Sequence, residues 1–297
     1  MCIPHTIKIV LFLLSILDMS AGCSLEEKEE DEATFKTSYL TRFMIWPAEL
    51  NENSGMIWYD SLIWTINDSG GDPFIYTVDT ITGKIIRHVK IAGADNIDWE
   101  EITQDESYIY IGDVGNNDGS RKDLRIYKIR KTDLTDTVVL PEIIEFGYAD
   151  QGEFTPARYD TPYDCEAMIS TGDSLYLFTK NWTGSYTRIY RMPALPGKYL
   201  TEHCGQLKVD GQVTASAYTA DNHRLHLVGY KDYIPFLWII DDFIPGEPYA
   251  GSMQQYLFPE KFGLQTEGIA ILDHGEILVS CEKGLSLPSL YKVTPGN

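Results

Sequence analysis

From Phe35 onward, hydrophobic and polar residues alternate over short runs, and a helical period of 3.6 residues is almost absent. The runs are rich in Ile, Val, Tyr, Trp and Leu, and clusters of Gly, Asp, Asn and Pro separate them. This pattern predicts short strands joined by turns. Residues 61–68 and 74–79 are two such runs, and Thr82-Gly83 predicts a hairpin turn into a third run, residues 84–91.

The strand pattern repeats along the chain. Five segments each open a predicted strand, and a second apolar run and then a third run with Tyr or Trp follow each of them: 54–56, 100–102, 166–168, 214–216 and 267–269. Their first positions are 46, 66, 48 and 53 residues apart. These intervals fit one four-stranded β-propeller blade per repeat. An antiparallel sandwich also has short strands, but the regular three-run units favour the propeller.

The sequence therefore predicts an all-β fold, a single β-propeller of five blades, with six as the alternative. The interval of 66 residues predicts an inserted loop, for which residues 145–161 supply the length. The last repeat ends before its outermost strand. Residues 41–46 are apolar and precede the first repeat, so we expect them to pair with the C-terminal blade and close the ring.

The N-terminus has the pattern of an export signal. Lys8 precedes a short apolar core, residues 9–17, which is too short to span a bilayer. Ser20-Ala21-Gly22-Cys23 resembles the bacterial lipobox, which implies lipidation of Cys23; an ordinary cleaved signal is the alternative. We expect a signal peptide over residues 1–23, an acidic tether over 24–34 and a propeller domain over 35–297.

The tether and the domain are both acidic. Residues 24–32 contain six acids and one Lys, a block that is expected to be solvated. Such a run after a lipidated cysteine resembles the surface-export signal of Bacteroidetes lipoproteins, and a plain linker is the alternative. We expect a lipoprotein on the outer membrane, at the cell surface or facing the periplasm, with the lipid as its only membrane contact.

Charge narrows the choice of partners. The formal net charge is -20. The tether accounts for -5 and residues 1–23 cancel, so the domain keeps -15. This charge repels polyanions and argues against nucleic acid as a partner. The three cysteines of the domain have no zinc-type spacing, and buried thiols are favoured over one disulfide: Cys165, Cys204 and Cys281.

Candidate chemistry gathers where the first strands enter the predicted channel. Three of the five aligned positions are carboxylates, and they are candidate catalytic residues: Glu100, Glu166 and Glu267. Residues beside them and at the ends of the second strands are candidate ligand-binding residues: Asp68, Asp98, Trp99, Asp113, Asp164, Lys180, Lys231 and Glu282. The histidines share no spacing, and no Ser-His-Asp arrangement is evident.

Oxygen-rich clusters suit a hard cation, and calcium is the possible cofactor. The expected metal ligands are Glu100, Glu166, Glu267 and Asp113. The alternative is that these acids cap turns and bind water. Paired carboxylates can also act as acid and base, and Lys180 and Lys231 can hold an anionic group such as a phosphate.

Several sequence segments resemble those of an uncharacterised group of Bacteroidetes propeller lipoproteins: residues 64–71, 98–102, 110–117, 164–168 and 265–269. The likeness covers most of residues 50–293. It is more distantly similar to phytase-like propellers supported by calcium. The phytase ligand set is incomplete here, and Thr214 interrupts the acidic ring. The resemblance implies the fold and leaves the activity open.

Two functions follow as expectations. The first is a surface-anchored binding module that recognises a small molecule, glycan or protein at an acidic site at the channel mouth. The second is a metal-assisted hydrolase of a phosphate or another ester. We favour binding, because a propeller scaffold does not determine function.

Overall fold

The computed structural model describes residues 38–247 and 251–295 of the 297-residue chain. These residues belong to one compact unit, Ala33–Asn297. The predicted signal peptide, Cys23 and the acidic tether lie outside the described residues. No helix in the described part is long and apolar enough to cross a membrane.

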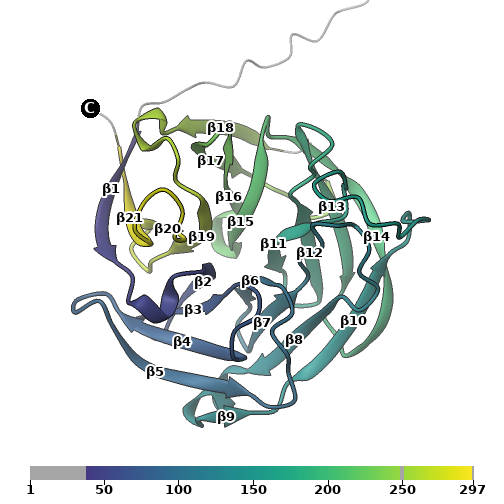
Figure 1. Cartoon of the computed structure of the whole chain (residues 1–297), viewed down its shortest axis with the longest axis horizontal. Coiled ribbons are helices and arrows are strands. Elements are labelled where there is room, and N and C mark those ends of the chain that lie inside the picture. Colours follow the sequence, from purple (N-terminus) through teal and green to yellow (C-terminus); the bar gives the residue numbers. More distant parts are fainter. Residues whose placement is uncertain (1–37, 248–250, 296–297) are drawn as a thin grey trace, which may run out of the picture. The chain divides into compact units, whose positions relative to one another are not determined.

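The described chain is all-β, and strand pairing gives four sheets of four, eight, four and five strands (Figure 1). The eight-stranded sheet consists of two sets joined edge to edge, so we describe the strands as five sets in chain order. The first set contains β2 (Asn53–Tyr59), β3 (Leu62–Asn67), β4 (Phe74–Asp79) and β5 (Lys84–Ile91). The second contains β6 (Trp99–Gln104), β7 (Tyr108–Asp113), β8 (Arg125–Arg130) and β10 (Glu142–Tyr148). The third contains β11 (Cys165–Ser170), β12 (Ser174–Thr179), β13 (Tyr186–Pro193) and β14 (Gly197–Lys208).

The fourth set contains β15 (Gln212–Thr219), β16 (Arg224–Lys231), β17 (Ile234–Asp241) and β18 (Ser252–Leu257). The fifth contains β19 (Thr266–Ile271), β20 (Ile277–Cys281), β21 (Ser289–Pro295) and β1 (Ser38–Ile45). The short strand β9 (Val138–Val139) pairs with β5. Short 3-10 turns complete the described structure: η1 (Ala48–Leu50), η2 (Lys131–Thr135), η3 (Ala220–Asn222) and η4 (Pro259–Lys261).

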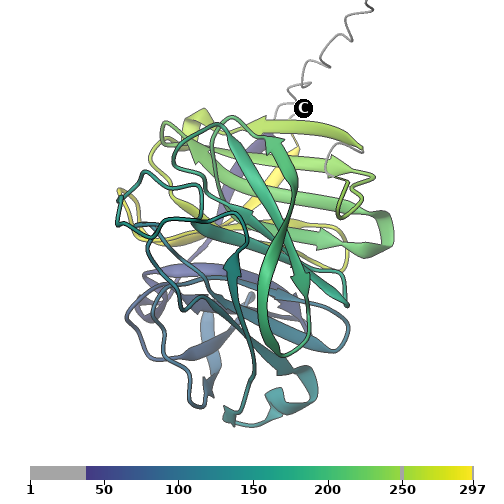
Figure 2. The ribbon, with the colours of Figure 1, turned by 90° about the vertical axis from the view of Figure 1, so that its right-hand side faces the viewer.

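The sets stand around a common axis, and the first strand of each lies innermost: β2, β6, β11, β15 and β19 (Figures 1 and 2). This arrangement is a β-propeller. β1 completes the last set by pairing antiparallel with β21, from Ser38 opposite Pro295 to Ile45 opposite Ser289. The predicted closure of the ring by an N-terminal strand is thus present. Between the second and third sets, β10 and β14 pair in parallel and join them edge to edge.

Five apolar clusters fill the spaces between neighbouring sets. One example joins Ile57 and Trp64 of the first set to Ile102 and Tyr127 of the second. Another joins Phe178 of the third set to residues of the fourth. The inner strands of the sets, such as β6 and β11, are buried on both faces, whereas outer strands such as β5 and β18 are partly exposed. Most large aromatic side chains serve this packing, as expected.

The three described cysteines are free, with Cys165 and Cys281 buried and Cys204 partly buried. The predicted loop over residues 145–161 is correct only in part. Residues 145–148 continue β10, and the irregular segment runs from Ala149 to Asp164 before β11 begins. This segment reaches the channel mouth, where it contributes to the candidate site.

Candidate functional site

Each of the five inner strands carries a β-bulge near its start. The register against the second strand shifts around one residue in every set: Gly55, Glu100, Glu166, Thr214 and Glu267. A bulge turns one extra side chain out of the regular alternation. Four of the five bulged residues are the aligned positions found in the sequence; in the first set the bulge falls at Gly55, one residue after Ser54. The bulges therefore gather the three glutamates at one mouth of the channel.

A cavity of about 200 Å³ lies at this mouth. Its carboxylates are Asp68, Glu100, Glu166, Glu267 and Glu282, and Lys180 is the only cation that lines it among the described residues. Uncharged residues complete it: Ser54, Asn117, Tyr159, Trp182, Tyr230 and Gln265. Six of the residues proposed from the sequence therefore meet in one cavity, which we call the acidic cavity.

Lys180 and Glu166 form a buried ion pair inside the acidic cavity. The Nζ of Lys180 donates to Oε1 of Glu166 at 3.0 Å, and the two side chains are only 8% and 3% exposed. The ammonium also lies 5.0 Å from the ring centroid of Trp182 and 5.8 Å from that of Tyr230. Burial lowers the pKa of Lys180, but the negative charges around it, that of Glu166 foremost, together outweigh it and hold that pKa above its usual value. The lysine is therefore charged at neutral pH.

Three other carboxylates converge without a cation among the described residues. Oxygens of Asp68, Asp98 and Glu100 all lie within 4.8 Å of one another. Burial raises the pKa of Asp68 to about 6, and burial together with neighbouring acids raises that of Asp98 to about 7. Burial and then Glu166 raise the pKa of Glu100 well above its usual value. We call this group the acidic triad.

Two features distinguish the carboxylates of the acidic triad: one of them lacks a hydrogen-bond donor, and the backbone of a glycine packs closely against two of them. Glu100 is 5% exposed, and no hydrogen-bond donor of the described chain reaches its carboxylate. A Cβ on Gly115 would lie 2.4 Å from both the Asp98 and Glu100 carboxylates, so only glycine fits there. A buried carboxylate without a donor is costly unless it binds a proton or a cation.

The two remaining carboxylates of the acidic cavity are Glu267 and Glu282. The Nε2 of Gln265 donates to Oε1 of Glu282 at 2.6 Å. Burial raises the pKa of Glu267 to about 8; Lys180 opposes this shift and Glu282 adds to it. Glu267 therefore retains a proton at neutral pH and can donate a hydrogen bond to a ligand.

Four residues proposed from the sequence lie elsewhere. Trp99 is completely buried between the first two sets, and its indole donates to the carbonyl of Asp95, so it does not line the acidic cavity. Asp113 pairs with Arg121 at 2.9 Å and already has a cation. Lys231 pairs with Asp210 at 2.5 Å in an exposed turn.

Asp164 is the fourth. It is fully buried and accepts hydrogen bonds from the backbone of Asn116 and from the indole of Trp182, at 2.6 and 2.7 Å. It therefore positions the cavity wall and does not line the cavity. Of the expected metal ligands, Glu166 is taken by Lys180 and Asp113 by Arg121, and the open cluster joins Glu100 to Asp68 and Asp98 instead.

Sequence reasoning missed Glu101, which lies deeper in the channel. It is fully buried, and its carboxylate accepts the backbone N–H of Ser216 on β15 at 2.8 Å and that of Ile102 at 3.0 Å. Glu101 therefore ties β6 to β15 across the axis. The only sign of Glu101 in the sequence was that a second acidic residue directly follows Glu100. Tyr159 and Tyr230 were missed too; Tyr159 comes from the irregular segment, and its ring centroid lies 4.5 Å from that of Trp182 with the two rings tilted by 45°.

No family model matches the chain, and no curated protein is similar to it. Solved structures similar to it include the β-propeller domain of Cps50 (Swd1) from Myceliophteria thermophila, with 11% identity, 87% and 100% of the two chains covered and a TM-score of 0.43. A glucose dehydrogenase has 6% identity, 87% and 99% coverage and a TM-score of 0.48. Hydrazine synthase of Kuenenia stuttgartiensis has 12% identity, 79% and 77% coverage and a TM-score of 0.42. At these values the likenesses carry no inference about function.

Proposed function

We propose that this propeller is a binding protein that holds its ligand at the acidic cavity through a hard divalent cation. The observation that carries the proposal is the acidic triad, in which three carboxylate oxygens from two chain segments, one with Asp68 and one with Asp98 and Glu100, lie within 4.8 Å of one another. Carboxylate oxygens are the ligands that calcium prefers, and it accepts flexible shells of six to eight oxygens. The side chain of Asn117 and backbone carbonyls are the nearby neutral oxygens that suit such a shell.

A ligand bound in the acidic cavity would contact both aromatic and acidic side chains. The aromatic side chains of Tyr159, Trp182 and Tyr230 face the same 200 Å³ as the acids. Small-molecule sites commonly combine such rings with a few convergent polar groups. This supports a small ligand, or one group of a glycan or protein, as the bound partner.

Calcium should stabilise the folded protein. A ligand that binds only the folded state at about one hundred times its Kd adds about 2.7 kcal/mol. For a domain of this size that is a rise in Tm of about 5–10 °C. We expect this rise when calcium is added to EDTA-treated protein, measured by thermal unfolding.

Variants inside and outside the acidic triad test where calcium binds. Glu100→Gln and Gly115→Ala should remove the calcium response, the first by removing a ligand charge and the second by filling the space between Asp98 and Glu100. Glu282→Gln lies in the same cavity outside the triad and should keep it. An unchanged Tm in the native protein at millimolar calcium would refute the cation site.

A second candidate function is hydrolysis of a phosphate ester, and Lys180 is the observation that favours it. Its ammonium lines the same cavity as Asp68 and Glu100, so an anionic group could contact both the lysine and a bound cation. Turnover of p-nitrophenyl phosphate with calcium, lost in Glu100→Gln while the fold is retained, would support the enzyme. Absence of turnover in a protein that binds calcium would leave the binding function.

We further propose that the protein is exported and lipid-anchored at the outer membrane. Support comes from the N-terminal sequence, in which a short apolar core leads to Ser20-Ala21-Gly22-Cys23 and then to an acidic run. Labelled palmitate should enter the protein in cells and should not enter Cys23→Ala. Protease treatment of intact cells separates a surface location from a periplasmic one.

A further inference from the structure

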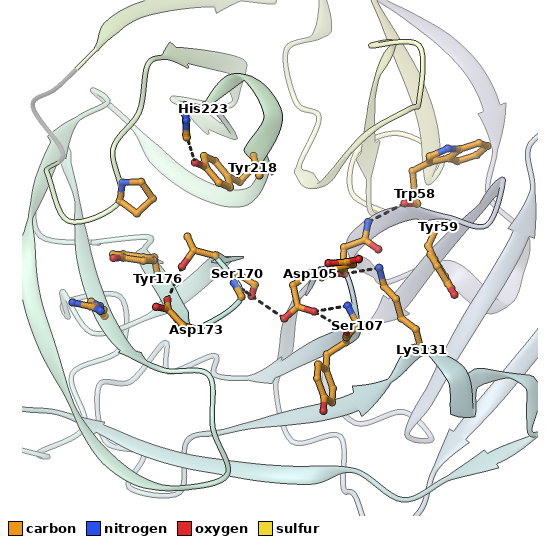
Figure 3. A pocket seen from close by; sticks show the side chains of 18 of the residues that line it. Trp58, Tyr59, Asp105, Ser107, Lys131, Ser170, Asp173, Tyr176, Tyr218 and His223 are labelled. Carbon is orange, nitrogen blue, oxygen red and sulfur yellow. Dashed lines mark hydrogen bonds between the residues drawn. The ribbon is translucent and has the colours of Figure 1, made fainter.

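A second and larger cavity, of about 1450 Å³, lies at the other ends of the inner strands (Figure 3). The acidic cavity lies where the inner strands begin, whereas this one is lined by residues that end them: Tyr59 of β2, Gln104 of β6 and Ser170 of β11. The turns that follow add Asp60, Asp105 and Gly172. We call it the distal cavity. Glu101, which ties β6 to β15, lies between the two.

The distal cavity is rich in hydrogen-bond acceptors and negative charge. Six carboxylates line it: Asp60, Asp105, Glu106, Asp173, Asp242 and Asp273. Within the described part of the chain, two lysine or arginine side chains line it, and both are hydrogen-bonded. The Nζ of Lys131 donates to the carbonyl of Asp105 at 2.6 Å, and the guanidinium of Arg191 donates to the hydroxyl of Ser174 at 3.1 Å. A ligand here must bring donors, and positive charge is favoured.

Aromatic rings line the same cavity. Two of them already carry cations of the chain itself: Lys131 lies 4.5 Å from the centroid of Tyr59, and Arg130 lies 5.4 Å from that of Tyr108. Within the described residues, no cation lies over the three remaining rings, which are Trp58, Tyr176 and Tyr218. Ring faces attract ammonium and guanidinium groups. The partly exposed rings of Trp58 and Tyr218 and the carboxylates therefore favour the same kind of ligand.

Two polar atoms of the wall lack partners in the described structure. Tyr176 is only 4% exposed, it points into the distal cavity in Figure 3, and no group hydrogen-bonds to its hydroxyl. The Oε1 of Gln104 is buried and also has no partner. Buried polar groups are normally hydrogen-bonded. A ligand N–H in the cavity can hydrogen-bond to the hydroxyl of Tyr176.

We propose that the distal cavity binds an extended peptide segment that carries Lys or Arg side chains. Its volume exceeds the roughly 300–1,000 Å³ of small-molecule sites, so it accommodates several residues. Lys and Arg supply what the wall lacks, namely N–H donors, positive charge and groups that lie over ring faces. The proposal is independent of the cation site in the acidic cavity.

The test uses the full chain and acetylated, amidated tetra-arginine in isothermal titration calorimetry. We expect one peptide per protein, and an affinity at least about tenfold lower for the variant Asp60→Asn/Asp242→Asn/Asp273→Asn. Asp60 and Asp242 have φ values of 51° and 54°, a conformation that Asn adopts readily, so the backbone should be retained. An unchanged Tm shows that the variant is folded. Tyr176→Phe keeps the ring and should weaken binding a few-fold.

Asp232→Asn is the matched control. Asp232 is exposed, has a φ of 49° and lies outside the distal cavity, so this variant should bind normally. An equal loss in Asp232→Asn would mean general attraction to an acidic surface and would overturn the proposal. Tighter binding of tetra-glutamate or of maltotetraose than of tetra-arginine would also overturn it. Equal affinity of native protein and triple variant would do the same.

Discussion

Replacing Lys180 by Met should destabilise the protein by about 3–5 kcal/mol, because it leaves Glu166 buried without its cation. The ammonium and the carboxylate lie 3.0 Å apart, and their side chains are only 8% and 3% exposed, so a carboxylate left alone there would be poorly hydrated. For a domain of this size the Tm should fall by about 10 °C or more. Urea unfolding followed by circular dichroism measures the free energy directly.

The pair offers internal controls. Lys180→Met/Glu166→Gln removes both charges and should recover a large part of the loss, because a neutral amide is cheaper to bury than a carboxylate. Lys231→Met breaks the exposed pair with Asp210 and should cost less than about 1 kcal/mol. If Lys231→Met costs as much as Lys180→Met, or if the double variant is no more stable than Lys180→Met, the ion pair does not have this role.

Much of the fold was predictable because it depends on local pattern. The short alternating runs, their repetition and the unpaired apolar segment at residues 41–46 gave the propeller and its closure by β1. The three glutamates at the mouth were predictable for the same reason, since they occupy one position of the repeat. The carboxylates are far apart in sequence, and the ring brings them together.

The errors come from single-residue offsets that sequence does not reveal. In the third set Cys165 pairs with Thr179, which places Lys180 beside the bulged Glu166. In the fourth set Val213 pairs with Gly229, so Tyr230 is the counterpart of Lys180. Lys231 lies one step further, and one step along a strand turns a side chain to the opposite face.

Asp113 lies one residue before the position that corresponds to Lys180, whereas Lys231 lies one residue after it. Trp99 pairs with Asp113, so Asp113 corresponds to Thr179 of the third set and not to Lys180. The bulge at Glu100 also explains the neighbouring acids. Strict alternation would send Glu100 and Glu101 to opposite faces, whereas the bulge lets both face the channel and leaves Trp99 between the sheets. Bulges depend on pairing across the sheet, and a single strand's sequence does not encode that pairing visibly.

The cation-free protein should lose stability as the pH rises from 6.5 to 8.5. Burial raises the pKa of Asp98 to about 7 and that of Glu267 to about 8, and it holds that of Glu100 well above its usual value. In the unfolded chain these carboxyls titrate near 4, so the folded state binds more protons throughout this window. Stability is then complete below the unfolded pKa and is lost as the pH passes the folded values.

Below pH 6.5 the titration of His226 changes the stability in the opposite direction to that of the carboxyls. Burial lowers the pKa of His226 to about 4, so its ordinary titration near 6.5 opposes folding only at lower pH. Between pH 6.5 and 8.5 the carboxyls dominate. The retention of one to two protons corresponds to a loss on the order of 3 kcal/mol. Urea midpoints in EDTA, measured across the window, give the slope.

The variant Glu267→Gln tests how much the carboxyl of Glu267 contributes to this pH dependence of stability. The glutamine is neutral at every pH, so this variant should lose less stability than native protein between pH 6.5 and 8.5 and should exceed it at pH 8.5. Glu276→Gln is the control: Lys292 lowers the pKa of Glu276, which titrates far below this window, and its slope should match that of native protein. A slope in Glu267→Gln equal to that of the native protein would show that Glu267 is already ionised in the fold. The proton that it is expected to offer a ligand would then be absent.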